Sequence, residues 1–172
     1  MTTSKKPNPD IDRTPLGRLV ETGLHDIVGY QLAQAAIAGH HVFMHQVGDT
    51  FQLRPVEFTI LALIEKNPGV SAKQLAQALA VTPPNITMWM DKLEGRGLVE
   101  RERSTTDRRA QHIRTTPEGS ALARKSVDLL ISGETESFAV LSRAERALLL
   151  ELLHKVARCR KAPASRGGAA QD

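Results

Sequence analysis

The sequence predicts a mainly α (α+β) protein that contains a single short β-hairpin. Alanine and leucine, which favour helices, dominate the apolar residues, and apolar positions recur at threes and fours along much of the chain. Only in residues 98–114 does the sequence pattern change from the helical period to the shorter period of β-strands, which predicts two strands. The chain has 172 residues, of which 41% are hydrophobic, so we expect one domain with a proper core.

The two ends of the chain are predicted to lie outside that domain. Residues 1–18 are polar and proline-rich, which indicates a flexible arm, and residues 163–172 are predicted to form a disordered tail. The folded domain should therefore span residues 19–162. Its first helix is expected over about residues 24–46, because the apolar repeat breaks at Gly48-Asp49.

Three further helices should follow closely in the sequence. Proline suits a first helical turn, so the next helix should begin at Pro55 and stop at Asn67-Pro68-Gly69. Ser71 is a natural N-cap with Gln74 three residues later, which is the spacing of a capping box. Thr82 should cap the helix after that. The buried stripe of this last helix should consist of Ile86, Met90 and Leu93.

A hairpin and two more helices complete the expected order. Residues 98–103 and 110–114 are strand candidates on either side of a short loop. A helix should run from Thr116 to about Ser132, and a last helix with an apolar face should follow Ser142.

The two short central helices are joined by a turn so tight that they must cross, which predicts a helix-turn-helix. In that motif the first residues of the second helix meet base edges in a major groove. Asn85 can pair with adenine, and Thr87 or Met88 can touch a thymine methyl group. The alternative is that these are simply exposed helix residues. The candidate DNA contacts here are Ser71, Thr82, Pro83, Pro84, Asn85, Thr87, Met88 and, toward a phosphate, Lys92.

The hairpin stretch RERSTTDRRAQHIR carries five arginines around a loop of small residues. A hairpin directly after a helix-turn-helix is the wing of a winged helix. Arg109 at its tip can enter a narrow minor groove, whose negative potential attracts arginine, and Asp107 can hold Arg109 in one geometry. Alternatively, the strand arginines alternate with glutamates on a solvated face. The remaining candidates for phosphate contacts are Arg101, Arg103 and Arg108.

From Leu53 to Gly119 the sequence resembles the MarR family of bacterial transcriptional regulators. The most specific matches are the stretch DKLEGRGLVER, the Asp107-Arg108-Arg109 tip and the Thr116-Pro117-Glu118-Gly119 exit. One position departs from the pattern, because Met88 stands where the family often has a basic residue. The resemblance implies that Arg109 is the wing arginine that enters the minor groove.

The resemblance also implies a quaternary arrangement and a mode of regulation. A DNA-binding lobe at about residues 53–116 would be joined to dimerisation helices at about 24–46 and 117–161. The homodimer would bind pseudo-palindromic duplex DNA, as a repressor that a small ligand, often an aromatic acid or a phenol, releases. The last helix is too apolar for a small winged core to cover alone, which also favours a dimer.

Three histidines of the first helix, His40, His41 and His45, are candidate effector contacts together with Trp89. His41 and His45 stand one helical turn apart, which is metal-ligand spacing, but no further ligand is evident, so we expect no metal. Trp89 is otherwise expected in the core. The single cysteine, Cys159, is expected to be inert or a minor dimer contact.

Composition narrows the function classes. A net charge of +4 and a pI of about 9.5 suit a polyanionic partner, and 3% aromatic residues argue against single-strand binding. No membrane span or secretory signal is evident, so we expect a cytoplasmic protein that associates with the nucleoid when bound to DNA. No nucleophile–base pair or phosphate loop stands out, so neither an enzyme nor a cofactor is expected. The alternatives are a winged-helix protein-interaction module and a metal-responsive regulator that uses the three histidines.

Overall fold

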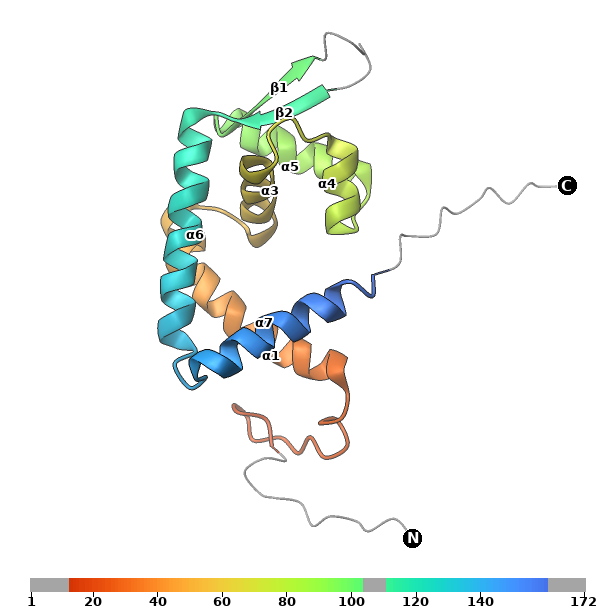
Figure 1. Ribbon diagram of the computed structural model, residues 1–172, viewed down its shortest axis with the longest axis vertical. Helices are drawn as coiled ribbons and strands as arrows, with labels where there is room; N and C mark the ends of the chain where they lie inside the picture. Colours follow the sequence, from red (N-terminus) through yellow and green to blue (C-terminus); the bar gives the residue numbers. More distant parts are fainter. Residues whose placement is uncertain (1–12, 104–110, 161–172) are drawn as a thin grey trace, which may run out of the picture. The chain divides into compact units, whose positions relative to one another are not determined.

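The computed structural model describes residues 13–103 and 111–160 (Figure 1). The chain divides into two compact units, Met1–Val42 and Phe43–Asp172, where the sequence predicted one domain over residues 19–162. The described residues form mainly helices and a single two-stranded antiparallel sheet, which confirms the predicted fold class.

The first unit contains a closed turn followed by a helix. Arg13 and Val20 form an isolated antiparallel bridge, so residues 13–18, which the sequence assigned to the N-terminal arm, lie within a turn. The rest of that arm and the predicted tail lie outside the described residues. The Tyr30 hydroxyl donates a 2.6 Å hydrogen bond to the carboxylate of Glu21. Tyr30 lies in the first turn of α1 (Val28–Phe43).

The second unit begins with helical residues where the sequence predicted a break. Residues Met44–Gly48 form the π-helix η1 and Asp49–Phe51 form the short α2, which ends at Gln52 with a φ of 51°. Gly48 is buried, and a Cβ at this position would lie 2.8 Å from the sulfur of Met44. Glycine therefore permits close packing inside the helical segment, which is why it does not end the helix there.

Three helices form the centre of the second unit: α3 (Pro55–Lys66), α4 (Ala72–Leu79) and α5 (Pro83–Gly95). The predicted capping box of α4 is present, because the Ser71 hydroxyl accepts from the Gln74 amide at 3.3 Å. Thr82 occupies the N-cap position of α5 without a side-chain cap. The two prolines that follow have no N–H to donate, so the Asn85 amide bonds to the Thr82 carbonyl instead, at 3.1 Å.

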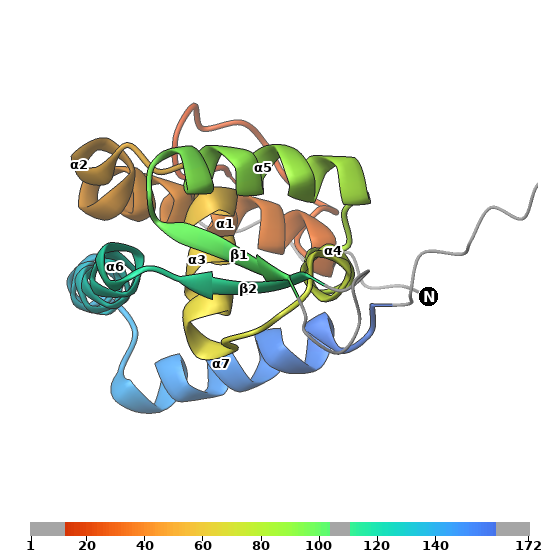
Figure 2. The ribbon, with the colours of Figure 1, turned by 90° about the horizontal axis from the view of Figure 1, so that it is seen from above.

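The hairpin follows α5 directly and lies beside it (Figure 2). Strand β1 (Val99–Arg103) pairs with β2 (Gln111–Thr115) in antiparallel register, with Val99 opposite Thr115 and Arg103 opposite Gln111. Each strand is within a residue or two of its predicted bounds. An isolated bridge between Val70 and Ile113 ties the hairpin to the segment that precedes α4.

Helix α6 (Pro117–Ser137) runs past Ser132, where the sequence predicted its end. Gly133 does not stop it, because this glycine is buried where a Cβ would lie 2.6 Å from the side chain of Gln46 in η1. At the other end of α6, a Cβ on Gly119 would overlap the backbone carbonyl oxygen of Leu98. Glycine therefore allows close approach at both ends of this helix.

The core of the second unit draws apolar side chains from α3, α4, α5, α6 and the hairpin. Helix α7 (Arg143–Ala157) follows Ser142 as predicted, is capped by the Ser142 hydroxyl and contributes no buried residue to this core. No helix in the described part of the chain is long and apolar enough to cross a membrane. The largest fully buried side chains include Ile60, Leu61, Ile64, Leu75, Ile86, Met90, Leu93 and Ile113.

Candidate nucleic-acid interface

The first turns of α5 present an exposed polar surface. Asn85 is exposed, and its side chain makes no hydrogen bond to another described residue. Met88 is 46% exposed, whereas the Thr87 hydroxyl is exposed but donates to the Pro83 carbonyl at 3.2 Å. An amide with unused donor and acceptor capacity beside an exposed apolar side chain is chemically suited to reading base edges.

The opposite face of α5 fixes this surface rigidly. Ile86, Met90 and Leu93 are at most 1% exposed, as the sequence predicted. Trp89 is half-buried and packs against the same core, in agreement with the core interpretation of this residue. Because close packing holds this buried stripe in place, the exposed residues on the other face of α5 have a defined position.

Two further predicted contacts, Ser71 at the start of α4 and Lys92 on α5, already have partners within the protein. The Ser71 hydroxyl donates to the Gln74 side chain at 2.8 Å while it caps α4. The Lys92 side chain is 44% exposed, and its ammonium lies 4.0 Å from the buried carboxylate of Glu57. That carboxylate also accepts from the Arg54 amide at 3.0 Å. Lys92 therefore keeps an exposed charge, but Glu57 draws it toward α3.

The hairpin is anchored to α5 through Arg101. Its guanidinium pairs with the carboxylates of Asp91, at 2.5 Å, and Glu94, at 3.4 Å, and the side chain is only 24% exposed. Across the hairpin, Arg114 pairs with Glu102 at 3.3 Å. These pairs favour a role inside the protein for Arg101, rather than the phosphate contact considered from the sequence.

The tip of the hairpin is not part of this geometry. Asp107, Arg108 and Arg109 lie outside the described residues, and of Arg103 the structure describes only its backbone place at the end of β1.

The three candidate effector histidines lie on exposed surfaces. His40 and His41 are exposed in the last turn of α1, and His45 is exposed in η1. In the parts of the chain that the structure describes, no group of three or more metal-ligating side chains comes together.

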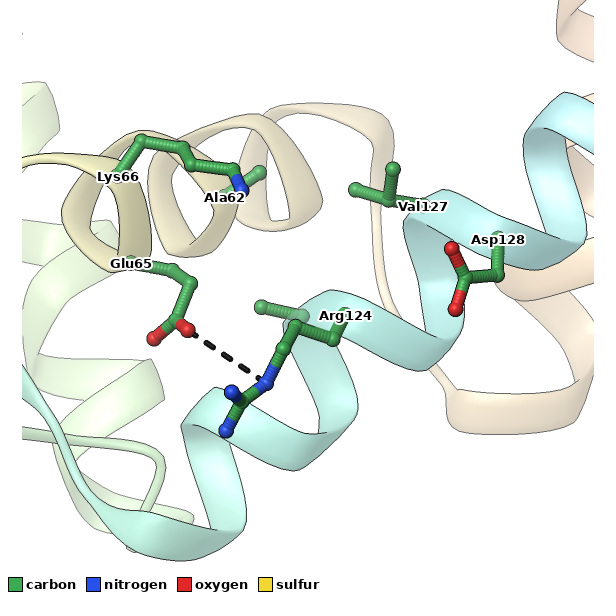
Figure 3. A pocket seen from close by; sticks show the side chains of 7 residues that line it. Ala62, Glu65, Lys66, Arg124, Val127 and Asp128 are labelled. Atoms are coloured by element: carbon green, nitrogen blue, oxygen red, sulfur yellow. Dashed lines mark ion pairs between the residues drawn. The ribbon is translucent and has the colours of Figure 1, made fainter.

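A cavity of about 290 Å³ between α3 and α6 was not singled out from the sequence (Figure 3). At its edge Glu65 accepts hydrogen bonds from the hydroxyls of Thr115, at 2.8 Å, and Ser120, at 2.9 Å. These hydroxyls, with Arg124 nearby, lower the pKa of Glu65 below its usual range. No local pattern marks Glu65, because its hydrogen-bond partners lie 50 and 55 residues away in the sequence.

Comparison with known proteins identifies relatives over most of the chain. A model described as the MarR family matches residues 53–110. The chain is 33% identical over 145 residues to a putative transcriptional regulatory protein for the hcr operon of Thauera aromatica, covering 83% of this chain and 86% of that protein. It is 25% identical over 114 residues to the transcriptional regulator HosA of Escherichia coli, covering 66% of this chain and 82% of HosA.

Solved structures show the same fold. The transcriptional repressor CouR, solved bound to a 23-mer DNA duplex, matches with a TM-score of 0.74 and 33% identity, over 81% of this chain and 99% of CouR. The PcaV regulator of Streptomyces coelicolor, solved with its natural ligand, matches with a TM-score of 0.70 and 20% identity, over 80% of this chain and 96% of PcaV. The second likeness concerns the fold alone.

Proposed function

Because this chain belongs to the MarR family of transcriptional regulators, we propose that it binds duplex DNA with α5 in a major groove and the β1–β2 hairpin over a neighbouring minor groove. The chain is a DNA-binding regulator with a winged helix, not an enzyme. The DNA-bound state of CouR, to which this chain is similar over most of its length, supports the proposed partner.

The observation that carries the proposal is the exposed amide of Asn85 at the start of α5. Its side chain has no hydrogen-bond partner in the described residues, while Ile86 beside it is fully buried. A bidentate contact of an asparagine with adenine requires a free amide on a fixed backbone. Met88, one turn on, adds an apolar contact that suits a thymine methyl group.

Two ion pairs set the position of the hairpin for this role. Arg101, in the middle of β1, pairs with Asp91 and Glu94 of α5, so these ion pairs hold the hairpin against α5. Arg109 at the tip is proposed to insert into the minor groove, with Asp107 as its partner. Arg103 and Arg108 are proposed to contact the flanking phosphates, and Lys92 a phosphate beside α5.

A homodimer is proposed from the apolar side chains that α7 leaves exposed. Leu149 is 43% exposed and Leu152 is 47% exposed, and no residue of α7 is buried. A second copy would cover this face, and two-fold symmetry would place two α5 helices about one DNA turn (~34 Å) apart. The matching operator is a pseudo-palindrome.

Repression that a small ligand relieves is the proposed form of regulation. CouR is described as a repressor, and the ligand-bound state of PcaV shows that this fold holds small molecules. His40, His41, His45 and Trp89 remain proposed effector contacts. An effector that changes the spacing or angle of the two α5 helices would weaken binding to both half-sites, through a coupling of about 1–3 kcal/mol.

The decisive experiment selects binding sites for the full-length protein from random duplex DNA. We expect an enriched pseudo-palindrome with half-sites about one helical turn apart. Binding that enriches no motif and is abolished by moderate salt would refute sequence-specific recognition.

Three variants then assign the contacts on the selected site. Asn85→Ala should lose about 1–3 kcal/mol of discrimination at one base pair. Lys92→Ala, as the matched phosphate variant, should weaken binding equally to all sequences and reduce its salt dependence. Arg109→Ala should weaken binding most at sites whose minor groove is narrow. An unchanged base preference in Asn85→Ala would show that α5 is not the reading helix.

A further inference from the structure

The junction between the hairpin and α6, residues 115–120, is bonded at both of its ends to one carboxylate of α3. Glu65, in the last turn of α3, accepts a hydrogen bond from the Thr115 hydroxyl at 2.8 Å and another from the Ser120 hydroxyl at 2.9 Å. Thr115 is the last residue of β2, and Ser120 lies in the first turn of α6. One side chain therefore holds the end of the hairpin and the start of α6 against α3.

A carboxylate suits this role because each of its oxygens serves one hydroxyl group. Oε2 of Glu65 accepts from Thr115, and Oε1 accepts from Ser120. Hydrogen bonds to an ionised carboxylate are stronger than those between neutral groups. The two hydroxyls lower the pKa of Glu65, so it is ionised at neutral pH, and the side chain is only 16% exposed to competing water. A glutamine would keep a single acceptor oxygen, and an alanine would keep none.

Arg124, one turn further along α6, adds a cation to the same cluster. Its guanidinium donates to the Ser120 hydroxyl at 2.7 Å and lies 3.6 Å from Glu65 (Figure 3). The Ser120 hydroxyl donates to Glu65 while it accepts from Arg124, so the three side chains form a continuous chain of hydrogen bonds. Because Arg124 is 65% exposed, solvent screens its attraction to Glu65, and the two hydroxyl groups contribute more.

The backbone of the same junction is also held by the turn before β1. The Thr116 hydroxyl donates to the Gly97 carbonyl at 2.7 Å, and the Thr116 amide donates to the Leu98 carbonyl at 3.1 Å. The same hydroxyl accepts from the Gly119 amide at 3.0 Å and so caps α6. The junction is therefore tied to α3 and to the turn before β1, and α6 leaves the hairpin in a fixed direction.

The length of α6 amplifies any change of direction at the junction. The helix has 21 residues and is therefore about 30 Å long. A change of about 10° in its direction displaces its far end by about 5 Å, which exceeds the rise of about 3.4 Å per base pair of DNA. Helix α7, whose exposed apolar face is proposed to form the dimer, follows after residues 138–142. The direction of α6 therefore determines how far apart a dimer holds its two α5 helices.

We propose that Glu65 is a positioning residue that sets the half-site spacing of the operator. Its carboxylate binds Thr115 and Ser120 and thereby fixes the direction of α6 relative to the hairpin. Glu65 acts through these two hydroxyl groups and not by contact with DNA. The inference rests on the proposed dimeric DNA reader and adds the residue that determines which spacing this reader accepts.

The first test measures operator affinity as a function of half-site spacing. The half-sites of the selected operator are kept, and the spacer is shortened or lengthened by one or two base pairs. Each change moves and rotates one half-site, so wild type should bind the altered operators about tenfold or more weakly. Glu65→Ala should bind all of these operators within about threefold of one another, with the base preference assigned to Asn85 unchanged. Glu65→Gln, which keeps one acceptor oxygen, should give an intermediate ratio.

Two control variants separate positioning from charge and from stability. Glu118→Ala removes the same charge from an exposed position in the first turn of α6. Ile60→Val removes one buried methylene group from α3 and lowers stability modestly without removing a bond of the junction. Both should retain the wild-type ratio of affinities between operators. A wild-type ratio in Glu65→Ala, or an equal loss of the ratio in either control, would overturn the proposal.

Removal of the hydroxyl groups tests whether Glu65 acts through them. The double variant Thr115→Val with Ser120→Ala should tolerate altered spacers as Glu65→Ala does, although its carboxylate is still present. Adding Glu65→Ala to this pair should change the ratio little further, because residues that act as one unit are not additive. Additive losses of spacing selectivity would show that Glu65 acts by another route. The double variant also decides the question if Glu65→Ala fails to fold.

A measurement without DNA separates the junction from the proposed function. In a Cys159→Ala background, Met88→Cys carries one spin label on each α5, and pulsed electron spin resonance gives the distance between the two labels of a dimer. We expect a narrow distance distribution, which becomes clearly broader when Glu65→Ala is added. Equal widths, or a monomeric protein, would overturn the proposal whether or not an operator is found. A broader distribution in a protein that selects no operator would support the role of Glu65 at the junction and refute only the proposed DNA recognition.

Discussion

Helices α5 and α7 have similar lengths and similar apolar patterns but opposite surroundings. In α5 the apolar stripe of Ile86, Met90 and Leu93 is at most 1% exposed. In α7 every apolar side chain from Leu148 to Val156 is at least 38% exposed, and no residue is buried. The difference shows that an amphipathic pattern predicts that the apolar face of a helix will be buried, but not whether the same chain or another chain buries it. For α5 the cover is this chain; for α7 we propose that it is a second copy.

The largest expected effect follows from placing a charge on the exposed face of α7. Leu152→Glu should leave the helix content of the protein intact but abolish the dimer, because a carboxylate would be buried in an apolar interface. Affinity for a two-half-site operator should then fall by roughly a hundredfold or more, since the two reading heads are no longer linked.

Light scattering and operator titration measure the two consequences of that change. Arg143→Glu, which puts the same charge on a polar position of the same helix, is the control and should remain a dimer. A dimeric Leu152→Glu protein would show that α7 is covered in some other way, and would remove the basis of the comparison with α5.

A substitution that leaves a cavity beside α5 should lower the stability of the fold without affecting the dimer, because the side chains that pack against α5 belong to the same chain. Leu93→Ala should lower the free energy of unfolding by about 2–5 kcal/mol, through lost burial and the space left behind. Urea denaturation at two protein concentrations measures this loss in the free energy of unfolding. The loss should be the same at both concentrations, with the fraction of dimer unchanged. A loss that grows on dilution would mean that α5 also takes part in the interface.

A smaller effect is expected where α6 meets the backbone before β1. In Gly119→Ala the new methyl group would overlap the Leu98 carbonyl oxygen, and a backbone cannot move aside as a flexible side chain does. We expect a loss of about 1–3 kcal/mol in the free energy of unfolding. Gly95→Ala is the matched control, since a Cβ there meets nothing within 4 Å. Equal stability of the two variants would contradict the close approach.

The smallest expected effect is a pH dependence that arises at Glu65. Hydrogen bonds from Thr115 and Ser120 lower its pKa from 4.5. A carboxyl whose pKa is lower in the folded state stabilises the fold above its unfolded pKa, and this stabilisation is lost as pH falls through the folded pKa. Near neutral pH, the free energy of unfolding of the wild type should therefore exceed that of Glu65→Gln by about 1 kcal/mol.

Urea denaturation of both proteins from neutral pH down to about pH 3 tests this prediction. The difference in their free energies of unfolding should shrink below pH 4.5. Glu102→Gln, whose exposed carboxylate pairs with Arg114 on the surface, should show little difference at any pH. A difference between wild type and Glu65→Gln that is independent of pH would mean that the hydroxyl groups bond to either form of this side chain.

Local signals predicted most of the elements that carry the interface. The Ser71 capping box, the prolines that open α3 and α5 and the change of period at the hairpin all act between residues close in the chain, and the structure confirms the elements that they mark. Glycine was less informative. Gly48 was expected to break the first helix, and α6 was expected to end near Ser132, but Gly48 and Gly133 both lie buried inside helices, where they allow a neighbouring side chain to approach.

The sequence by itself determined the mainly helical class, the helix-turn-helix, the hairpin and the buried stripe of α5, because each follows from a periodicity or a cap that spans a few residues. Only the tertiary structure showed that Arg101 is paired with α5, and that Glu65 joins Thr115, Ser120 and Arg124 beside a cavity. Those contacts connect side chains up to 59 positions apart. Their formation depends on how the helices pack, and no local pattern of apolar and charged residues encodes that.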